Sequence, residues 1–426
     1  MSANTTTLPP LGKSGGSGEQ LSGGAASANG ATSNEKSALK AAKGGLICRR
    51  QLCFLLAFIL PVPKLLEAPS LLAYFSKGDL LLPAFLHYVL QTGVLIALLC
   101  VCARSDKPLF QRLREVSKPL AAAVYIALAA YFIFSDLFPL LDLARFADTA
   151  FFDTAPSVSA FLPFFLLSAF ICVKDEKAIG RSADLCMPIF LFAFFGLIFM
   201  AFGETDFTEL FPVFGTSAGE NFKGMYHSFV HFSDMALMIP LLGAYRYEKG
   251  DGKKIVGAYA GGGAFVLLFL AVFYGVFGAL APRETYAFDK IARYFSALDV
   301  VGRVDLLLVY LITVVLLYAY ALPLQLAVIC LCGACGVGMG DVGAGGVGAD
   351  ETGGIGAGAK HAERAKRRRL IFSLSVNGAA LLFVLFASRR YHFFYSLTTA
   401  KLFFVFPIFS VALPLSFLLL KGDKKR

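Results

Sequence analysis

Residues 58–69 read Phe-Ile-Leu-Pro-Val-Pro-Lys-Leu-Leu-Glu-Ala-Pro and interrupt the first long apolar run of the chain. The three prolines, Pro61, Pro63 and Pro69, each remove a backbone N–H donor and clash with a preceding carbonyl, which disfavours a continuous helix. Carbonyl groups that are freed at membrane depth are tolerated only where they are buried in protein or line a cavity. The stretch therefore predicts a first span that bends at Pro61 or Pro63 beside a binding cavity, with both prolines as candidate ligand-binding residues.

Two charged side chains lie in the same interruption. Lys64 and Glu67 are three residues apart, which is the spacing of neighbours on a helix. Two interpretations stay open: the two residues pair with each other inside the break, or the span ends near Leu60 and Lys64 lies at the membrane interface. Because ionisable groups inside membrane spans are functional candidates, Glu67 is also a candidate ligand-binding residue.

The composition of the chain as a whole indicates a membrane protein. Hydrophobic residues make up 57% of the 426 residues, charged residues make up 16%, and the mean hydropathy is +0.68. A soluble domain has about 25% charged residues, and it must cover its surface with polar groups. The composition therefore excludes a soluble enzyme, a nucleic-acid-binding protein and a fibrous protein, and it predicts an all-α protein with several membrane spans.

Ten runs of the chain are apolar enough to be membrane spans, each of which needs roughly 20 residues. The predicted spans are 51–76, 80–102, 119–138, 158–173, 184–202, 218–245, 254–279, 304–332, 370–387 and 402–420. The segment 139–153 is amphipathic and is predicted to lie on the membrane surface instead. Lys and Arg concentrate in the N-terminal tail, in every second loop and at the C-terminus, which predicts that both termini are cytoplasmic.

The same pattern divides the chain into regions. Residues 1–45 are rich in small and polar residues and are predicted to be a disordered cytoplasmic tail. Residues 46–420 form the predicted ten-helix domain, and 421–426 form a short basic tail. The stretch 333–369, rich in Gly and then in Lys and Arg, is predicted to be a cytoplasmic loop between the eighth and ninth spans. Its basic run at 366–369 favours contact with membrane lipid over contact with nucleic acid.

The predicted sixth span contains an unusual density of polar residues. Tyr226, His227, His231 and Asp234 all precede its apolar half. His227, His231 and Asp234 follow each other at i, i+4 and i+7, so they are predicted to share one helical face. Three interpretations stay open, namely a polar ligand or proton site, a buried structural network and a metal site. No third metal ligand is secure, so we assign no metal and expect these four residues to bind ligand.

The two interrupted spans are five spans apart. Interruptions at corresponding positions of two five-helix halves are typical of transporters built as an inverted repeat. In such a fold the third and eighth spans also line the site, which adds Tyr125 and Tyr318 as candidate ligand-binding residues, although a tyrosine in a span more often serves packing. We therefore expect ten transmembrane helices in a five-plus-five inverted repeat, with the first and sixth helices broken.

Three stretches of the chain are similar to a known family. Residues 50–73, 212–240 and 295–305 resemble the B-subunit permeases of GerA-type spore germinant receptors, within the amino acid–polyamine–organocation superfamily. Asp234 stands where that family more often has Glu. The resemblance covers roughly residues 49–332 and more weakly 370–420.

The resemblance carries expectations about fold and function. It implies a fold of the leucine-transporter type, a small nutrient germinant such as an amino acid as ligand, and assembly with an A subunit and a lipoprotein C subunit. It also implies a place in the cytoplasmic membrane, which is the inner membrane of the spore. A proton- or sodium-coupled secondary amino acid transporter is the alternative. No cofactor and no enzyme activity are expected, because no nucleophile or second carboxylate completes a catalytic set around Asp234.

Overall fold

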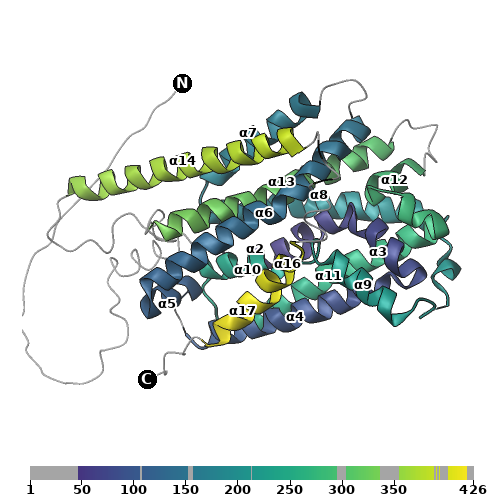
Figure 1. Ribbon diagram of the computed structural model, residues 1–426, viewed down its shortest axis with the longest axis horizontal. Coiled ribbons are helices and arrows are strands. Elements are labelled where there is room, and N and C mark those ends of the chain that lie inside the picture. Colours follow the sequence, from purple (N-terminus) through teal and green to yellow (C-terminus); the bar gives the residue numbers. More distant parts are fainter. Residues whose placement is uncertain are drawn as a thin grey trace, which may run out of the picture. The chain divides into compact units, whose positions relative to one another are not determined.

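The computed structural model describes residues 47–105, 108–151, 157–212, 214–294, 304–335, 355–387, 390, 393 and 402–419. All regular secondary structure in these residues is helical (Figure 1). The predicted tails 1–45 and 421–426 and the Gly-rich residues 336–354 lie outside the described residues, so the predictions about them stay predictions.

Six helices among the described residues contain a stretch long and apolar enough to cross a membrane. They are α4 (Leu81–Ala103), α6 (Lys118–Phe151), α8 (Glu176–Phe202), α11 (Asp251–Phe277) with its 3-10 extension η6 (Gly278–Arg283), α13 (Val304–Ala334) and α14 (Ile355–Ala387). α13 packs against α6, α8 and α14 near the middle of the structure (Figure 1). This arrangement confirms a helical integral membrane protein.

The first predicted span is bent, but not at Pro61 or Pro63. The break lies between Leu65 and Ala68, and Pro61 and Pro63 lie in turns that precede it. It comprises α2 (Arg49–Phe54), η2 (Leu55–Ile59), η3 (Val62–Leu65), α3 (Ala68–Ser76) and η4 (Lys77–Asp79). The parts on either side of the break meet at an angle of 63°. Within the turn before the break, the Lys64 amide donates to the Pro61 carbonyl at 3.0 Å and the Leu66 amide donates to the Pro63 carbonyl at 3.3 Å, which is 3-10 bonding.

The sixth predicted span is interrupted in the same manner. It consists of α9 (Ala218–Ser228) and α10 (Asp234–Gly243), and the chain leaves the helical path between them. The prediction that His227, His231 and Asp234 share one helical face is therefore wrong. His227 lies in α9, His231 lies in the break and Asp234 begins α10, because the helix ends before the i+4 and i+7 positions are reached.

The prediction of a surface segment at 139–153 is also wrong. α6 continues through Pro139 to Phe151, and Leu140, Leu141 and Phe146 are buried. One proline removes only one donor, and the apolar residues on both sides of it keep packing against α13 and α7. The third helix is therefore longer than its predicted span, and most residues from Leu140 to Phe146 lie inside the protein.

The remaining elements are short. They are α5 (Leu109–Val116), α7 (Ser157–Val173), η5 (Phe207–Leu210), α12 (Ala287–Tyr294), α16 (Val405–Pro407), η9 (Ile408–Ala412), α17 (Leu413–Ser416) and η10 (Phe417–Leu419). Shorter apolar helices at Phe161–Val173, Asp234–Gly243 and Val405–Leu419 fall within the predicted fourth, sixth and tenth spans. Because these are too short to qualify as spans alone, the count of ten and the inverted repeat stay predictions.

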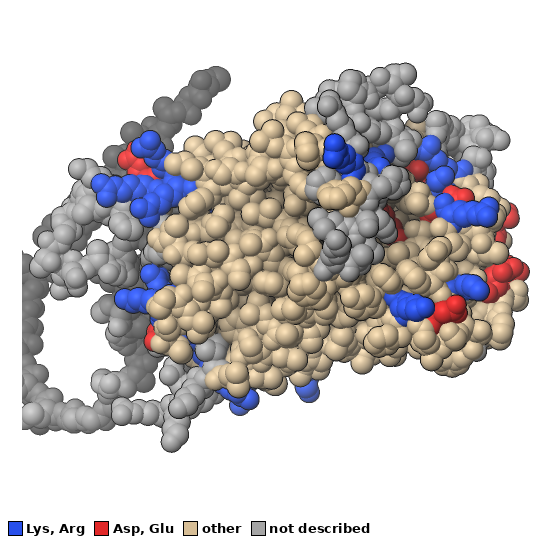
Figure 2. Space-filling model, viewed as in Figure 1, with Lys and Arg blue, Asp and Glu red and all other residues tan. Residues whose placement is uncertain are grey.

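The surface of the described residues is that of a protein in a bilayer. Lys, Arg, Asp and Glu gather toward two ends of the face shown in Figure 2, and the broad band between them is largely uncharged. Large apolar side chains such as Leu166 of α7, Phe199 of α8 and Phe386 of α14 are exposed. In water such a surface would aggregate, whereas lipid tails cover it without cost.

Candidate functional site

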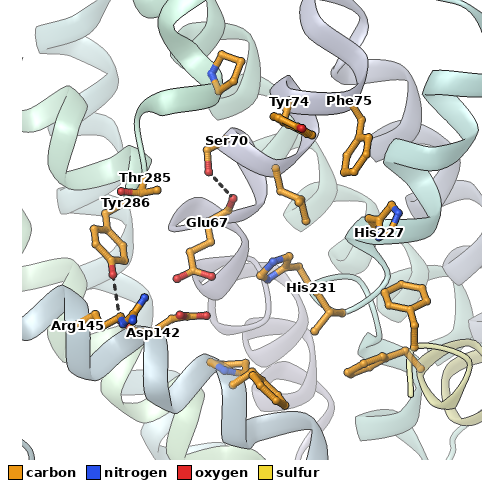
Figure 3. Close-up of a pocket in the computed structure, with 17 residues that line it drawn as sticks. Glu67, Ser70, Tyr74, Phe75, Asp142, Arg145, His227, His231, Thr285 and Tyr286 are labelled. Atoms are coloured by element: carbon orange, nitrogen blue, oxygen red, sulfur yellow. Dashed lines mark hydrogen bonds between the residues drawn. The ribbon is translucent and has the colours of Figure 1, made fainter. Parts of the chain in front are cut away.

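A cavity of about 610 Å³ lies where the two interrupted spans approach the second half of α6 (Figure 3). Its walls come from α3, α6, the break after α9, the turn between η6 and α12, and the residues that enter α16. Tyr74, Arg145 and Thr285 line it with exposed side chains, so the cavity is open to the outside of the protein on that side. A volume of this size suits a small molecule.

One wall of the cavity carries charge. The carboxyl groups of Glu67 and Asp142 face each other, and Arg145 lies beside Asp142 on α6 (Figure 3). Glu67 is the residue that precedes the first turn of α3, and the Ser70 hydroxyl donates to its backbone carbonyl at 3.1 Å. The Tyr286 hydroxyl donates to the Asp142 backbone carbonyl at 3.5 Å. Two facing carboxyl groups favour a proton or a cation between them, since like charges at close range repel.

The opposite wall is aromatic. The His227 ring stacks on the Phe75 ring, with 4.7 Å between centroids and 5° between planes. Tyr226 packs on Phe403, with 4.2 Å between ring centroids, and Phe403 itself lines the cavity. His231 lies nearer the charged wall and points into the cavity from the break (Figure 3). The cavity thus offers charge on one side and flat apolar surface on the other.

Three of the nine predicted ligand-binding residues line this cavity: Glu67, His227 and His231. Tyr226 does not line the cavity itself, but its ring packs on Phe403, which does. The other five lie elsewhere, as follows. Pro61 packs toward Gly262 of α11, and Pro63 lies in the 3-10 turn. Tyr125 packs on Phe110 with 4.5 Å between ring centroids, and the Tyr318 hydroxyl donates to the Ile179 carbonyl at 3.2 Å. Asp234 is buried in an ion pair.

That ion pair joins the two interrupted spans. Lys64 Nζ lies 2.7 Å from Asp234 Oδ1 and donates to the Leu60 carbonyl at 2.8 Å. The Tyr259 hydroxyl of α11 donates to Asp234 Oδ2 at 2.9 Å. Lys64 is 1% exposed and Asp234 is 4% exposed. Both predictions about Lys64 are therefore wrong, because it neither pairs with Glu67 nor lies at the membrane interface.

Sequence reasoning missed Asp142, Arg145 and Tyr286. The first two fall in the segment that was predicted to lie on the membrane surface, where charged residues are ordinary. The apolar positions between and around them continue the helical period of the third span, and that signal was available. Tyr286 carried no sequence signal, because it lies in a turn between η6 and α12.

His87 of α4 contacts the end of α9, at the break in the sixth span. His87 Nε2 lies 2.7 Å from the Met225 carbonyl and 3.0 Å from the Ser228 hydroxyl, at the last turn of α9. Its ring stacks on Phe232 with 4.7 Å between centroids. The carbonyl groups that the end of α9 leaves without helical partners therefore find a side-chain partner.

The side chains that line the cavity are suited to binding a small polar molecule. Within the part of the chain that the structure describes, no group of three or more His, Cys, Asp or Glu side chains is arranged to hold a metal ion. A charged wall, a pair of imidazoles and an aromatic wall can orient a small polar molecule through hydrogen bonds and ring contacts.

A known protein family matches a large part of the chain. The sequence profile of the spore permease family, described as spore germination protein, matches residues 85–332, which is more than half of the chain. Among individually curated proteins no match is found. The matched region includes α6, both helices of the interrupted sixth span and α11, so it contains most of the walls described above. The chain belongs to the spore permease family of spore germination proteins.

Proposed function

We propose that this chain is the ligand-sensing membrane subunit of a spore germinant receptor and that it binds a small amine, such as an amino acid, in the cavity between the interrupted spans. The observation that carries the proposal is the pair of facing carboxyl groups, Glu67 and Asp142, at the break of the first span. The family, which is one of germination permeases and not a class of enzymes, supports the role in germination.

The walls of the cavity suit the two ends of an amino acid. A ligand ammonium group would lie between the Glu67 and Asp142 carboxyl groups, where an ion is poorly hydrated and charge-assisted hydrogen bonds are strong. A ligand carboxylate would meet Arg145 or the imidazole of His231. An apolar side chain would rest on Phe75 and the aromatic residues around it.

The alternative is a proton- or sodium-coupled secondary transporter. The two interrupted spans favour it, because secondary transporters typically bind substrate and ions at interrupted helices of this kind. Uptake of a radiolabelled amino acid into vesicles that contain only this chain would support transport, whereas binding without uptake would support sensing.

The proposal includes a place and partners for the chain. The excess of Lys and Arg in alternate loops supports cytoplasmic N- and C-termini in the inner membrane of the spore. An A subunit and a lipoprotein C subunit would receive the conformational change. Co-purification of all three from spore membranes, and its loss in a strain without this chain, would test the assembly.

The binding role is tested by neutralising the carboxyl pair. Glu67→Gln and Asp142→Asn remove one negative charge each and keep the size of the side chain. Loss of one charge-assisted hydrogen bond costs about 1.5–3 kcal/mol, so the ligand concentration for half-maximal germination should rise roughly 10- to 150-fold. Glu220→Gln is the matched control, because Glu220 is exposed at the start of α9.

The measurement is the germination response of spores to a panel of the common amino acids, with the abundance of the chain in spore membranes determined in parallel. Normal abundance with an unchanged dose-response in both variants would refute the proposed site. Reduced abundance would instead assign Glu67 and Asp142 to folding.

A further inference from the structure

The first unusual feature of the Lys64–Asp234 ion pair is its contact with the Leu60 carbonyl. In an α-helix this carbonyl would accept from the Lys64 amide, four residues on. The Lys64 amide donates to the Pro61 carbonyl instead, and the Leu60 carbonyl accepts from the ammonium group of the same lysine at 2.8 Å. The 3-10 turn that leads into the break therefore leaves the Leu60 carbonyl without its helical donor, and the Lys64 ammonium group donates to it instead.

The second feature is the position of Asp234. It is the first residue of α10, where the helix dipole favours a negative charge. One of its oxygens contacts Lys64 Nζ at 2.7 Å, and the other accepts from Tyr259 at 2.9 Å. The Phe232 ring lies 5.6 Å from the ammonium nitrogen and adds a cation–π contact. The carboxylate is thus fixed in place from two sides.

The donor set around the ammonium group is that of a cation site. It combines a carbonyl freed by the turn before the break with a carboxylate at the start of a half-helix. Broken-helix membrane proteins coordinate monovalent cations with such freed carbonyls, and a carboxylate adds the opposite charge. We propose that the Lys64 ammonium group occupies a cation-binding site shared by the two interrupted spans, so that the chain holds its breaks together with its own cation and requires no dissolved sodium.

A purely stabilising role would not require charges at this place. Burying an ion pair costs desolvation that an apolar pair of similar volume avoids, so buried ion pairs add little net stability. Here, however, the two charges come from the two interrupted spans and lie 170 positions apart. The Lys64 ammonium group donates to the free Leu60 carbonyl, and the Asp234 carboxylate lies at the N-terminus of α10, where the helix dipole favours a negative charge. An apolar pair could fill the volume but could neither bind the Leu60 carbonyl nor match the dipole of α10.

The inference makes a specific prediction about removal of the lysine. Lys64→Ala leaves the Leu60 carbonyl and the Asp234 carboxylate around an empty space, and a small external cation should then bind there. The midpoint of thermal unfolding of the variant should be lower than that of the wild type in choline chloride. Sodium chloride or methylammonium chloride should raise it in a saturable manner at the same ionic strength.

The experiment uses the full chain purified in detergent. A thiol-reactive fluorescent dye reports unfolding, because Cys102, Cys172 and Cys330 are buried and free and the chain has no tryptophan. The Lys64→Ala/Asp234→Asn double variant should lose the response to sodium and methylammonium. Lys253→Ala, at an exposed lysine of α11, controls for general effects of salt.

Two results would overturn the inference. One is a wild-type midpoint that rises with sodium but not with choline, since the site would then be incomplete without a dissolved ion. The other is a Lys64→Ala midpoint that is equal in all salts. If Lys64→Ala does not accumulate, Lys64→Ser replaces it, because its small side chain also removes the charge and leaves the space open for a cation. This test needs no germinant, so its outcome is independent of the proposed function.

Discussion

Gly262 of α11 is the position at which the path of the bent first span can be tested most directly. A Cβ atom at this position would lie 2.7 Å from the Leu56 carbonyl oxygen, 3.1 Å from Pro61 Cγ and 3.2 Å from the Ala57 Cα atom. Two of these neighbours are backbone atoms, which cannot move aside as the end of a flexible side chain can. Gly262→Ala therefore forces α11 away from the first span.

The size of the effect follows from two opposing terms. Extra atoms in a tightly packed interior cost typically about 1–3 kcal/mol. Replacing Gly by Ala in a helix gains at most about 1 kcal/mol of propensity. Gly262→Ala should therefore lower the free energy of unfolding by up to about 2 kcal/mol. Gly261→Ala is the matched control, because nothing lies within 4 Å of a Cβ atom there, and it should leave stability unchanged or slightly higher.

The assay compares both variants with the wild type in detergent, through the concentration of denaturing detergent at which the buried thiols react with dye. Equal midpoints for Gly261→Ala and Gly262→Ala would refute the reasoning. Such a result would mean that α11 does not contact the first span at Leu56 and Pro61, and the bent path of that span would have to be abandoned.

Two further predictions concern the ends of the interrupted spans. The Asp79 carboxylate accepts hydrogen bonds from the backbone amides of Phe214 and Thr216, both at 2.7 Å. Asp79→Asn should therefore release the loop before α9 and speed its cleavage by an added protease. An unchanged cleavage rate would show that these bonds do not hold the loop. Asp251 forms an ion pair with Arg49 at 2.9 Å. Asp251→Asn should therefore loosen the start of the first span from α11 and increase maleimide labelling of the half-buried Cys53. Unchanged labelling would argue against this contact.

The breaks of the first and sixth spans could be predicted because their causes are local. Proline acts on the backbone within one turn, so Pro61, Pro63 and Pro69 are enough to predict a bend in the first span. The polar residues from Tyr226 onward likewise predicted that the sixth span is not a uniform apolar helix. The place where that helix stops could not be read from spacing, and the predicted face of His227, His231 and Asp234 failed for this reason.

The partners of the buried charges could not be predicted. Lys64 had Glu67 as a neighbour in sequence, but the folded chain places Asp234 at 2.7 Å from its nitrogen. Which carboxylate meets which cation depends on how two distant breaks are packed. Asp142 and Arg145 were misplaced for a different reason, since a helix that is longer than one span was interpreted as a span followed by a surface segment.

The two charge systems are linked by the bent segment itself. Glu67 lines the cavity within the break of the first span, and Lys64 lies three residues earlier, in the 3-10 turn that precedes the break. Under the proposed function, a ligand ammonium group that drew Glu67 toward Asp142 would pull on the short connection through Leu65 and Leu66, which leads to Lys64. Lys64 is tied to Asp234 at the start of α10, so the displacement reaches the second half of the sixth span. If the cavity binds ligand as proposed, binding would thereby change the relation between the two interrupted spans.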